Sequence, residues 1–390
     1  MCQPLTASAQ STENTKGNLQ VVNNKVMAPG GKLFIPEGIS IYGGLEDKDY
    51  TKNLSSVDAQ IIAAVKYWHA NTIRLQVAES NLFSNLSGGE TFNHQFLNEL
   101  IREVKLARSL HAAVVINDQT EFTNKTPAPT NLTTQFWQVV SRTFTNRPYI
   151  IFDLFNEPRL VNLTNPRPFT YTRFSKFLLP LKSERPFLIN RASSAKQKIW
   201  TIWKYGGWVR GTNYVGMQSL VQHVRQTGAN NLIWAEGTSW SQRLPAGKFL
   251  LSGRNIEYSY HHINLNDIKD WSFIGRLAKS RPVVDGEWSQ YQSPWQECYY
   301  RAPVNVPHYL AYLKTLHIGL IAWSLQPGSL LKGRPNIIPS NTTKNTSTDK
   351  ASQLRSPSTF SKDYLCNDEF GHGAGKLIMN YFQANASPLT

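Results

Sequence analysis

Eight short apolar runs alternate with longer amphipathic segments along this chain of 390 residues. A short apolar run between turn signals is typical of a strand buried on both faces. The predicted strands are Phe34–Tyr42, Thr72–Val77, Ala112–Ile116, Tyr149–Phe155, Asn231–Ala235, Ile256–Tyr260, Pro282–Asp285 and Gly319–Ser324. Eight strands alternating with helices favour a (β/α)8 TIM barrel. An open doubly wound sheet would need a glycine-rich phosphate-binding turn after an early strand, and no such turn is present.

The segments between these runs have the spacing of helices that bury one face. The predicted helices include Ala59–Trp68, Leu97–Ala107, Val215–Gln226 and a last one beginning near Gly373. Gly228 follows the third of them, at the position where a helix end favours glycine. We therefore predict a flexible tail over residues 1–30 and one α/β barrel domain over residues 31–390.

Two stretches depart from the alternation, and each follows a predicted strand. Residues 159–213, after the fourth strand, hold eleven Lys and Arg and one acid, a net charge of +10 out of +15 for the chain, with nine aromatic residues. Residues 332–365, after the eighth strand, are rich in Ser and Thr and of low complexity, so they cannot bury a core. Both stretches should lie on the rim where barrel active sites sit, the first as a flap docked by Phe174, Phe177 and Phe187.

Composition and cysteines limit the class of protein. The apolar content of 41% is ample for a large core, and no apolar run approaches the roughly 18 residues of a membrane span. Cys2, Cys298 and Cys366 have no metal-binding spacing, and a Cys298–Cys366 disulfide stays open because it depends on export. Cys2 directly after Met1 resembles a lipoprotein signal trimmed at its lipidated cysteine, with an ordinary residue in a polar tail as the alternative. We expect a secreted or cell-surface protein.

Two predicted strands end in a glutamate. The fourth ends in Asn156, Glu157 and Pro158, and the seventh continues through Gly286 to Glu287. Strands four and seven lie across a barrel from each other, so both carboxyls can face one cleft. Hydrolysis of an acetal needs two such carboxyls, because one protonates the leaving oxygen and the other stabilises or captures the oxocarbenium ion. Either glutamate alone would fit a surface ion pair, but the two together favour catalysis.

With these segments the chain resembles glycoside hydrolase family 5, the cellulase-like retaining barrel glycosidases, from about Gly38 to Trp323. The resemblance implies that Glu157 is the acid/base, that Glu287 is the nucleophile, and that Asn156 contacts the 2-hydroxyl of the reacting sugar. It implies a retaining β-glycoside hydrolase that cleaves β-linked polysaccharide or oligosaccharide, endo-β-1,4-glucanase- or mannanase-like. No cofactor and no metal are expected, since the nine histidines have no ligand spacing.

Further segments extend the resemblance to the substrate-binding residues. These are expected to be Arg74, Asn156, Tyr260, His261, Trp288 and Trp323. Arg74 matches the family's arginine beneath the nucleophile and should keep Glu287 ionised, because a positive neighbour lowers the pKa of a carboxyl. Trp323 matches the tryptophan that floors the sugar subsite, where an aromatic ring suits a pyranose face.

The chain also departs from the family pattern. Gln119 follows Asn117 and Asp118 where the family often has a histidine after strand three, and Ile263 stands where a tyrosine is usual, with Tyr260 or His262 as substitutes. These departures leave open a catalytically silent carbohydrate-binding barrel. The basic insertion leaves open a nucleic-acid binder, but with no nucleic-acid motif we favour contact with an anionic cell-wall surface, and we expect a monomer.

Overall fold

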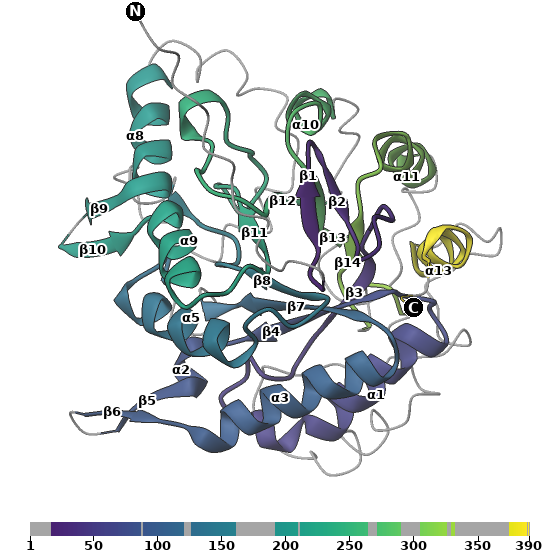
Figure 1. The fold of residues 1–390 in the computed structure, drawn as a ribbon, viewed down its shortest axis with the longest axis horizontal. Coiled ribbons are helices and arrows are strands. Elements are labelled where there is room, and N and C mark those ends of the chain that lie inside the picture. The colour runs from purple at the N-terminus through teal and green to yellow at the C-terminus, as the bar shows by residue number, and fades with distance from the viewer. Residues whose placement is uncertain are drawn as a thin grey trace, which may run out of the picture.

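Eight parallel strands close into a barrel, and each strand pairs with the next one along the chain (Figure 1). In chain order they are β3 (Glu37–Ile41), β4 (Thr72–Val77), β7 (Ala113–Asp118), β8 (Ile150–Asp153), β11 (Leu232–Glu236), β12 (Ile256–Ile263), β13 (Val283–Ser289) and β14 (Leu320–Ala322). The last strand, β14, pairs with β3 and closes the ring. The expected (β/α)8 barrel is confirmed, with every strand at its predicted place.

This computed structural model describes residues 17–86, 89–120, 126–160, 192–209, 211–263, 271–289, 305–325, 329–331, 374–387 and 389. The three cysteines, the Ser/Thr-rich stretch over residues 332–365 and the three phenylalanines expected to dock a flap lie outside these residues. Within the described part of the chain, no helix is long and apolar enough to cross a membrane.

Helices surround the barrel on its outer side (Figure 1). They are α1 (Leu54–Lys66), α3 (His94–Ser109), α5 (Asn131–Thr143), α9 (Met217–Gln226), α10 (Ser272–Ala278), α11 (Asn305–Leu316) and α13 (Ala374–Asn385). Each buries an apolar stripe, and in α3 this stripe is formed by Phe96, Leu100 and Val104. Helix α3 begins where Asn93 accepts the Phe96 N–H, an N-cap that fixes the start of the helix.

Smaller elements lie in the loops that follow β3, β4 and β11. They are α2 (Glu79–Leu82), the hairpin of β5 (Phe83–Leu86) and β6 (Gly89–Phe92), and two short 3-10 helices, η1 (Tyr50–Lys52) and η3 (Gly247–Phe249). These elements extend the loops after the strands, and Asn81 of α2 donates to the carbonyl oxygens of Leu45 and Asp47 in the loop after β3. The loops after β3 and β4 therefore support each other at one side of the rim.

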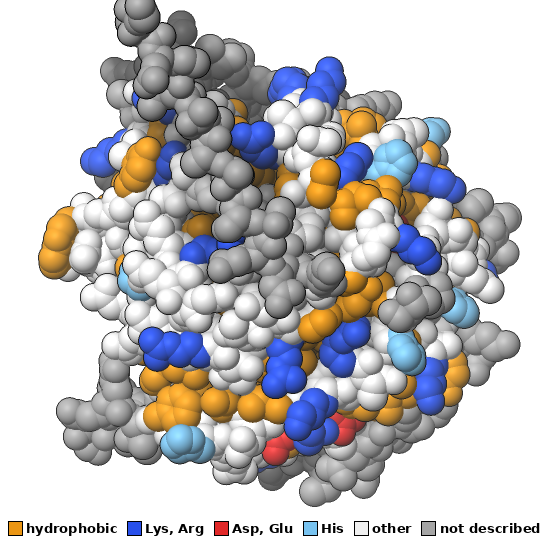
Figure 2. Space-filling model, viewed as in Figure 1, with side chains coloured by type: hydrophobic (Ala, Val, Ile, Leu, Met, Phe, Trp, Pro, Cys, Tyr) orange, Lys and Arg blue, Asp and Glu red, His pale blue; other side chains and the backbone are white. Residues whose placement is uncertain are grey.

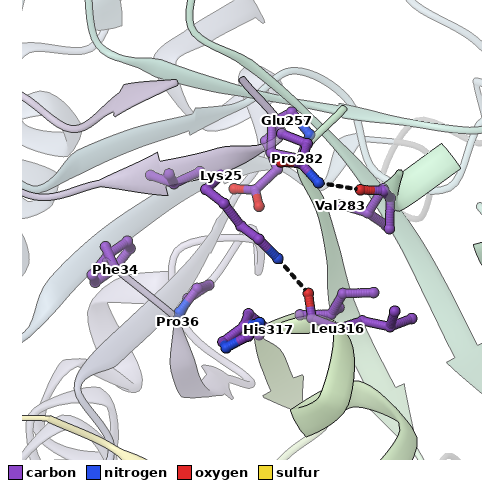
Figure 3. Close-up of a pocket in the computed structure, with 13 residues that line it drawn as sticks. Lys25, Phe34, Pro36, Glu257, Pro282, Val283, Leu316 and His317 are labelled. Atoms are coloured by element: carbon purple, nitrogen blue, oxygen red, sulfur yellow. Dashed lines mark hydrogen bonds between the residues drawn. The ribbon is translucent and has the colours of Figure 1, made fainter. Parts of the chain in front are cut away.

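Residues 20–27 form a hairpin of β1 (Gln20–Val22) and β2 (Lys25–Met27), so the expectation of a flexible tail over residues 1–30 is wrong for this part. Val26 is buried in a cluster with Trp234 of β11, at the amino-terminal end of the barrel. The Lys25 ammonium donates to the Leu316 carbonyl oxygen at 2.6 Å, beside a small pocket that Glu257 also lines (Figure 3). A few apolar side chains anchor this polar segment, so its average composition hid the hairpin.

The described part of the basic insertion consists of α8 (Ala192–Tyr205) and a hairpin of β9 (Gly206–Val209) and β10 (Thr212–Val215). Trp203 of α8 is buried, and its indole N–H donates to the Glu236 carbonyl oxygen at 2.9 Å, at the end of β11. Trp208 of β9 is 76% exposed. Lys and Arg side chains far outnumber acidic ones over the face in Figure 2, as the net charge of +15 leads one to expect.

Candidate active site

The barrel interior is apolar near the amino ends of its strands and polar near their carboxyl ends. Val115, Ile151, Trp234 and Val284 belong to the apolar cluster that the amino-terminal hairpin covers. Further along the strands, the Arg74 side chain from β4 contacts side chains from β8, β11 and β13, which are not neighbours of β4. Side chains from distant strands can meet only inside the barrel, so this polar layer forms the floor of the candidate site.

Arg74 lies at the centre of the polar layer and is fully buried. Its guanidinium donates to Asp153 Oδ2 (3.1 Å), Glu287 Oε2 (2.9 Å), Ser40 Oγ (3.5 Å), Asn156 Oδ1 (2.7 Å) and Glu236 Oε1 (2.9 Å). These five contacts use every N–H of the guanidinium, whose rigid fork fixes the direction of each. Arg74 therefore sets the relative positions of Glu287 and Asn156 and contacts the glutamate that the resemblance led us to expect beside it.

Glu157 and Glu287 meet in this site although they follow strands on opposite sides of the barrel. One carboxylate oxygen of Glu157 lies within 4.8 Å of one carboxylate oxygen of Glu287. Both residues are buried. A separation near 5 Å is typical of retaining glycosidases, whereas inverting enzymes keep their carboxyls roughly 6.5–9.5 Å apart to hold a water between them. The geometry therefore provides the pair of carboxyls that the sequence predicted.

A β-bulge at Gly286 turns Glu287 toward the interior. The pairing between β12 and β13 advances from Tyr260 opposite Asp285 to His261 opposite Glu287, which skips Gly286. Side chains alternate along a strand, so without the extra residue Glu287 would lie on the opposite face from the interior residue Val284. A Cβ on Gly286 would lie only 2.0 Å from Ser259 Oγ, which explains the glycine.

His261 lies between the two glutamates. Its Nδ1 is 3.0 Å from Glu157 Oε1 and 3.9 Å from Glu287 Oε2, and its Nε2 is 3.2 Å from Glu236 Oε1. Burial alone would lower the pKa of His261, but Glu236 and Glu287 hold it well above its usual range, so the ring carries a positive charge. The predicted site residue His261 is thus in contact with both predicted catalytic carboxyls.

The pKa of Glu287 differs from the expectation. Arg74 forms the expected ion pair and lowers this pKa, as does His261, but burial outweighs both and raises it to about 7. The neighbouring carboxylates of Glu157 and Glu236 raise it further. Burial therefore keeps Glu287 only partly ionised at neutral pH despite the two positive neighbours.

Glu236 is a buried carboxyl of the site that the sequence analysis missed. It ends β11 and contacts both Arg74 and His261. Burial alone would raise its pKa, but His261, Arg74 and the hydroxyl of Ser241 lower it to about 2. The signal was present, since an apolar strand followed by an acid is the same pattern that pointed to Glu157 and Glu287.

Two predicted substrate-binding residues lie outside the site. His261 faces the interior, so Tyr260 faces the outer helices, where its hydroxyl contacts that of Tyr309 from α11. Trp288 follows the inward-facing Glu287 and is fully buried in the outer core. Because both rings are buried against the outer helices, we withdraw both as substrate-binding candidates.

Trp323 follows β14 at the rim and remains a candidate for contact with a sugar. It is partly exposed, and its ring meets that of Tyr42 edge to face, with the centroids 5.6 Å apart. Tyr42, which follows β3, is 39% exposed. These two rings provide partly exposed aromatic surface at the carboxyl end of the barrel, and sequence alone did not indicate Tyr42.

Asn117 and Gln119, at the end of β7 where the family pattern often has a histidine, belong to the polar layer. Asn117 donates to Asp153 Oδ2 at 3.1 Å, and the side-chain oxygen of Gln119 accepts from Gln76 at 3.1 Å, with both residues buried. Both amides are therefore held by buried partners, and Glu157 and Glu287 still meet in the site.

Among the described residues, Glu157, His261 and Glu287 place three ligand atoms within 4.8 Å of one another, close enough in distance for a metal ion. Charge argues against that use, because Arg74 already pairs with Glu287 at 2.9 Å and the His261 ring is itself cationic. A metal ligand histidine must be neutral at the nitrogen that binds. The donor set fits acid/base and nucleophilic chemistry better than metal binding.

Comparisons with known proteins agree with this geometry. A family model described as Cellulase (glycosyl hydrolase family 5) matches residues 41–329. The catalytic domain of an endoglucanase from Thermobifida fusca, solved with cellotetraose, is 12% identical with a TM-score of 0.58, covering 94% of this chain and 98% of that one. A β-glucanase from Saccharophagus degradans, solved with cellotetraose, is 15% identical with a TM-score of 0.57, covering 97% and 98%. A search of curated proteins gives no match.

Proposed function

Because the chain belongs to glycosyl hydrolase family 5 and is therefore a glycoside hydrolase, we propose that it cleaves a β-linked glucan or mannan by double displacement. The observation that carries this proposal is the approach of Glu157 and Glu287, whose carboxylate oxygens come within 4.8 Å. That spacing leaves no room for the water that an inverting enzyme activates, and it suits attack by one carboxylate on the sugar that the other has helped to release.

In the first step, a carboxylate oxygen of Glu287 attacks the anomeric carbon. The bond from that carbon to the leaving oxygen breaks, and this oxygen takes the bond's electron pair and the proton of Glu157. Arg74 and His261 contact Glu287 Oε2, so Oε1 is the oxygen directed to the sugar. His261 likewise contacts Glu157 Oε1, so Oε2 is the oxygen that carries the transferred proton.

In the second step, Glu157 acts as the base. Its carboxylate takes a proton from water, the water oxygen attacks the anomeric carbon, and the ester bond to Glu287 breaks to restore the carboxylate. Two displacements at one carbon retain its configuration. Arg74 and the cationic His261 favour this release, because they stabilise the negative charge that returns to Glu287.

The substrate class follows from the family and from the residues around the two glutamates. We assign Asn156, which Arg74 holds at 2.7 Å, to the 2-hydroxyl of the reacting sugar, and Trp323 to the sugar face. The solved structures of similar fold that hold cellotetraose make β-1,4-glucan the first substrate to test. We further propose a secreted or cell-surface monomer whose excess of positive charge favours anionic cell-wall polymers.

Turnover of chromogenic β-cellobiosides and β-mannobiosides, followed by product analysis on the corresponding polysaccharides, tests the proposal. We expect the wild type to release dye from at least one of these glycosides. We expect Glu157→Gln to lose hydrolysis of the corresponding polysaccharide. Glu257→Gln is the matched control, since it alters a buried glutamate of β12 at the opposite end of the barrel and should leave turnover intact. Sugar binding without turnover in the wild type would instead favour a silent carbohydrate-binding barrel.

A further inference from the structure

The two carboxylate oxygens of Glu236 accept three hydrogen bonds and form an ion-pair contact with His261. Its Oε1 is 2.9 Å from Arg74 Nη2 and 3.2 Å from His261 Nε2, and its Oε2 is 2.6 Å from the Glu157 N–H nitrogen and 2.5 Å from Ser241 Oγ. The side chain is fully buried and ionised, with a pKa of about 2. A buried carboxylate with this many donors has a fixed orientation.

The backbone of Glu157 depends on this carboxylate. Glu157 has a φ of +45°, in the left-handed region that is unfavourable for a non-glycine residue. The hydrogen bond from its N–H to Glu236 Oε2 offsets that cost, because it is a charge-assisted bond in a buried place. Glu236 thereby holds the peptide that directs the Glu157 side chain into the cleft.

The side chain of Glu157 depends on the same carboxylate through His261. The imidazole contacts Glu236 with Nε2 and Glu157 with Nδ1, so the ring bridges the two carboxylates. The other charged groups near the ring are Glu287, Arg74, Asp153 and Asp285. Removing Glu236 would leave the Glu157 carboxylate without support at both ends.

The loop that follows β11 also supports Glu236, through the hydroxyl of Ser241. Ser239, Trp240 and Ser241 have φ values of +60°, +55° and +54°, three consecutive non-glycine residues in the left-handed region. Such a turn persists only where the surroundings enforce it. In this turn the Ser241 hydroxyl donates to Glu236, and the Ser241 carbonyl oxygen accepts from the backbone N–H of His261 at 3.1 Å.

We propose that Glu236 is a positioning residue for the acid/base Glu157, acting on its peptide and, through His261, on its carboxyl; this inference rests on the proposed function. It predicts that Glu236 matters most when the leaving group needs a proton. The competing role is support of the nucleophile Glu287 through Arg74, which every substrate needs equally.

Glu236→Gln separates the two roles when kcat/KM is measured on β-glycosides with good and poor leaving groups. Positioning of the acid predicts a loss of about 100-fold or more on oligosaccharides and less than about tenfold on a 2,4-dinitrophenyl glycoside, whose departure needs no proton. Azide should then raise kcat on the dinitrophenyl glycoside, because it replaces the water that Glu157 activates. Equal losses on both substrates, or no loss, would overturn the proposal.

Two further variants keep the test decisive. Glu257→Gln should leave both substrates unaffected, which shows that loss of a buried glutamate alone does not produce the pattern. Ser241→Ala removes one hydrogen bond to Glu236 and should give the same dependence on the leaving group at a few-fold size, even if Glu236→Gln does not fold. A uniform effect in Ser241→Ala would contradict the role. Failure of the wild type on every β-glycoside would instead remove the proposed function.

Discussion

The two glutamates differ in their surroundings, and that difference fits the two roles that we propose for them. Glu287 pairs with the arginine that also holds Asn156, whereas Glu157 pairs with His261 and has its peptide held by Glu236. A nucleophile needs positive charge that stabilises it as it leaves the sugar, and an acid/base needs a fixed direction toward the leaving oxygen. Each carboxyl has the partners that its proposed role requires.

The raised pKa of Glu287 predicts the acid limb of the pH profile. The nucleophile must be ionised, and burial raises its pKa to about 7, so protonation below this value removes activity. We expect kcat/KM on an aryl β-glycoside to be near half its maximum at about pH 7 and to level off above it, since this parameter reports the free enzyme. An acid limb near pH 4.5, the ordinary range of a glutamate, would show that Arg74 outweighs burial.

Replacement of each glutamate predicts a different rescue. Glu287→Ala should have no detectable turnover, and azide should restore a slow reaction whose product is the glycosyl azide of inverted configuration. Glu157→Ala should lose about 10²–10⁴-fold on substrates with poor leaving groups but keep activity on a dinitrophenyl glycoside. Product configuration by NMR distinguishes the two, and the opposite pattern would exchange the roles.

At the level of elements, the bulge in β13 decides which face carries the catalytic residue. The alternation of side chains along a strand is visible in a sequence, but an extra residue that reverses it is not. The bulge explains why Trp288 was expected in the site although it faces the outer helices, whereas Tyr260 was expected there through the family resemblance.

Gly286→Ala tests the bulge. The added Cβ would lie 2.0 Å from Ser259 Oγ, so either the serine or the strand must move and Glu287 with it. A small displacement of a catalytic group can cost about 10–100-fold in rate, and we expect a loss of kcat of this size. The double variant Ser259→Gly with Gly286→Ala removes the collision and should recover most of the activity. If it recovers none, the bulge is not limited by this contact.

The amino-terminal hairpin predicts a stability effect without a catalytic one. Phe34, which follows it, is 5% exposed and packs edge to face against Tyr149 at the closed end of the barrel. Phe34→Ala should lower the free energy of unfolding by about 3 kcal/mol, measured in urea, because it opens a cavity in that cluster. KM should stay unchanged because the cleft is at the opposite end. A change below about 0.5 kcal/mol would mean that the hairpin does not seal the barrel.

For the whole molecule, the fold could be predicted from the sequence because eight buried strands leave eight apolar runs. The strands keep their places, while α1 begins before its predicted start, where the first turn has no periodic signal, and ends at Lys66 rather than at Trp68. The site was predictable in part. Strand-end acids pointed to Glu157 and Glu287, and the same pattern at Glu236 was overlooked. Tyr42 is recognised only through its contact with Trp323, which exists only after the barrel has closed.

The central claim is that Glu157 and Glu287 perform two successive displacements at one carbon. The most direct test is the configuration of the first-formed product, followed by NMR while the wild type cleaves a β-linked oligosaccharide such as cellotetraose or a manno-oligosaccharide. The spacing of the two carboxylates, within 4.8 Å, predicts that the β-anomer appears first and that mutarotation produces the α-anomer only later. Initial appearance of the α-anomer would contradict the double displacement.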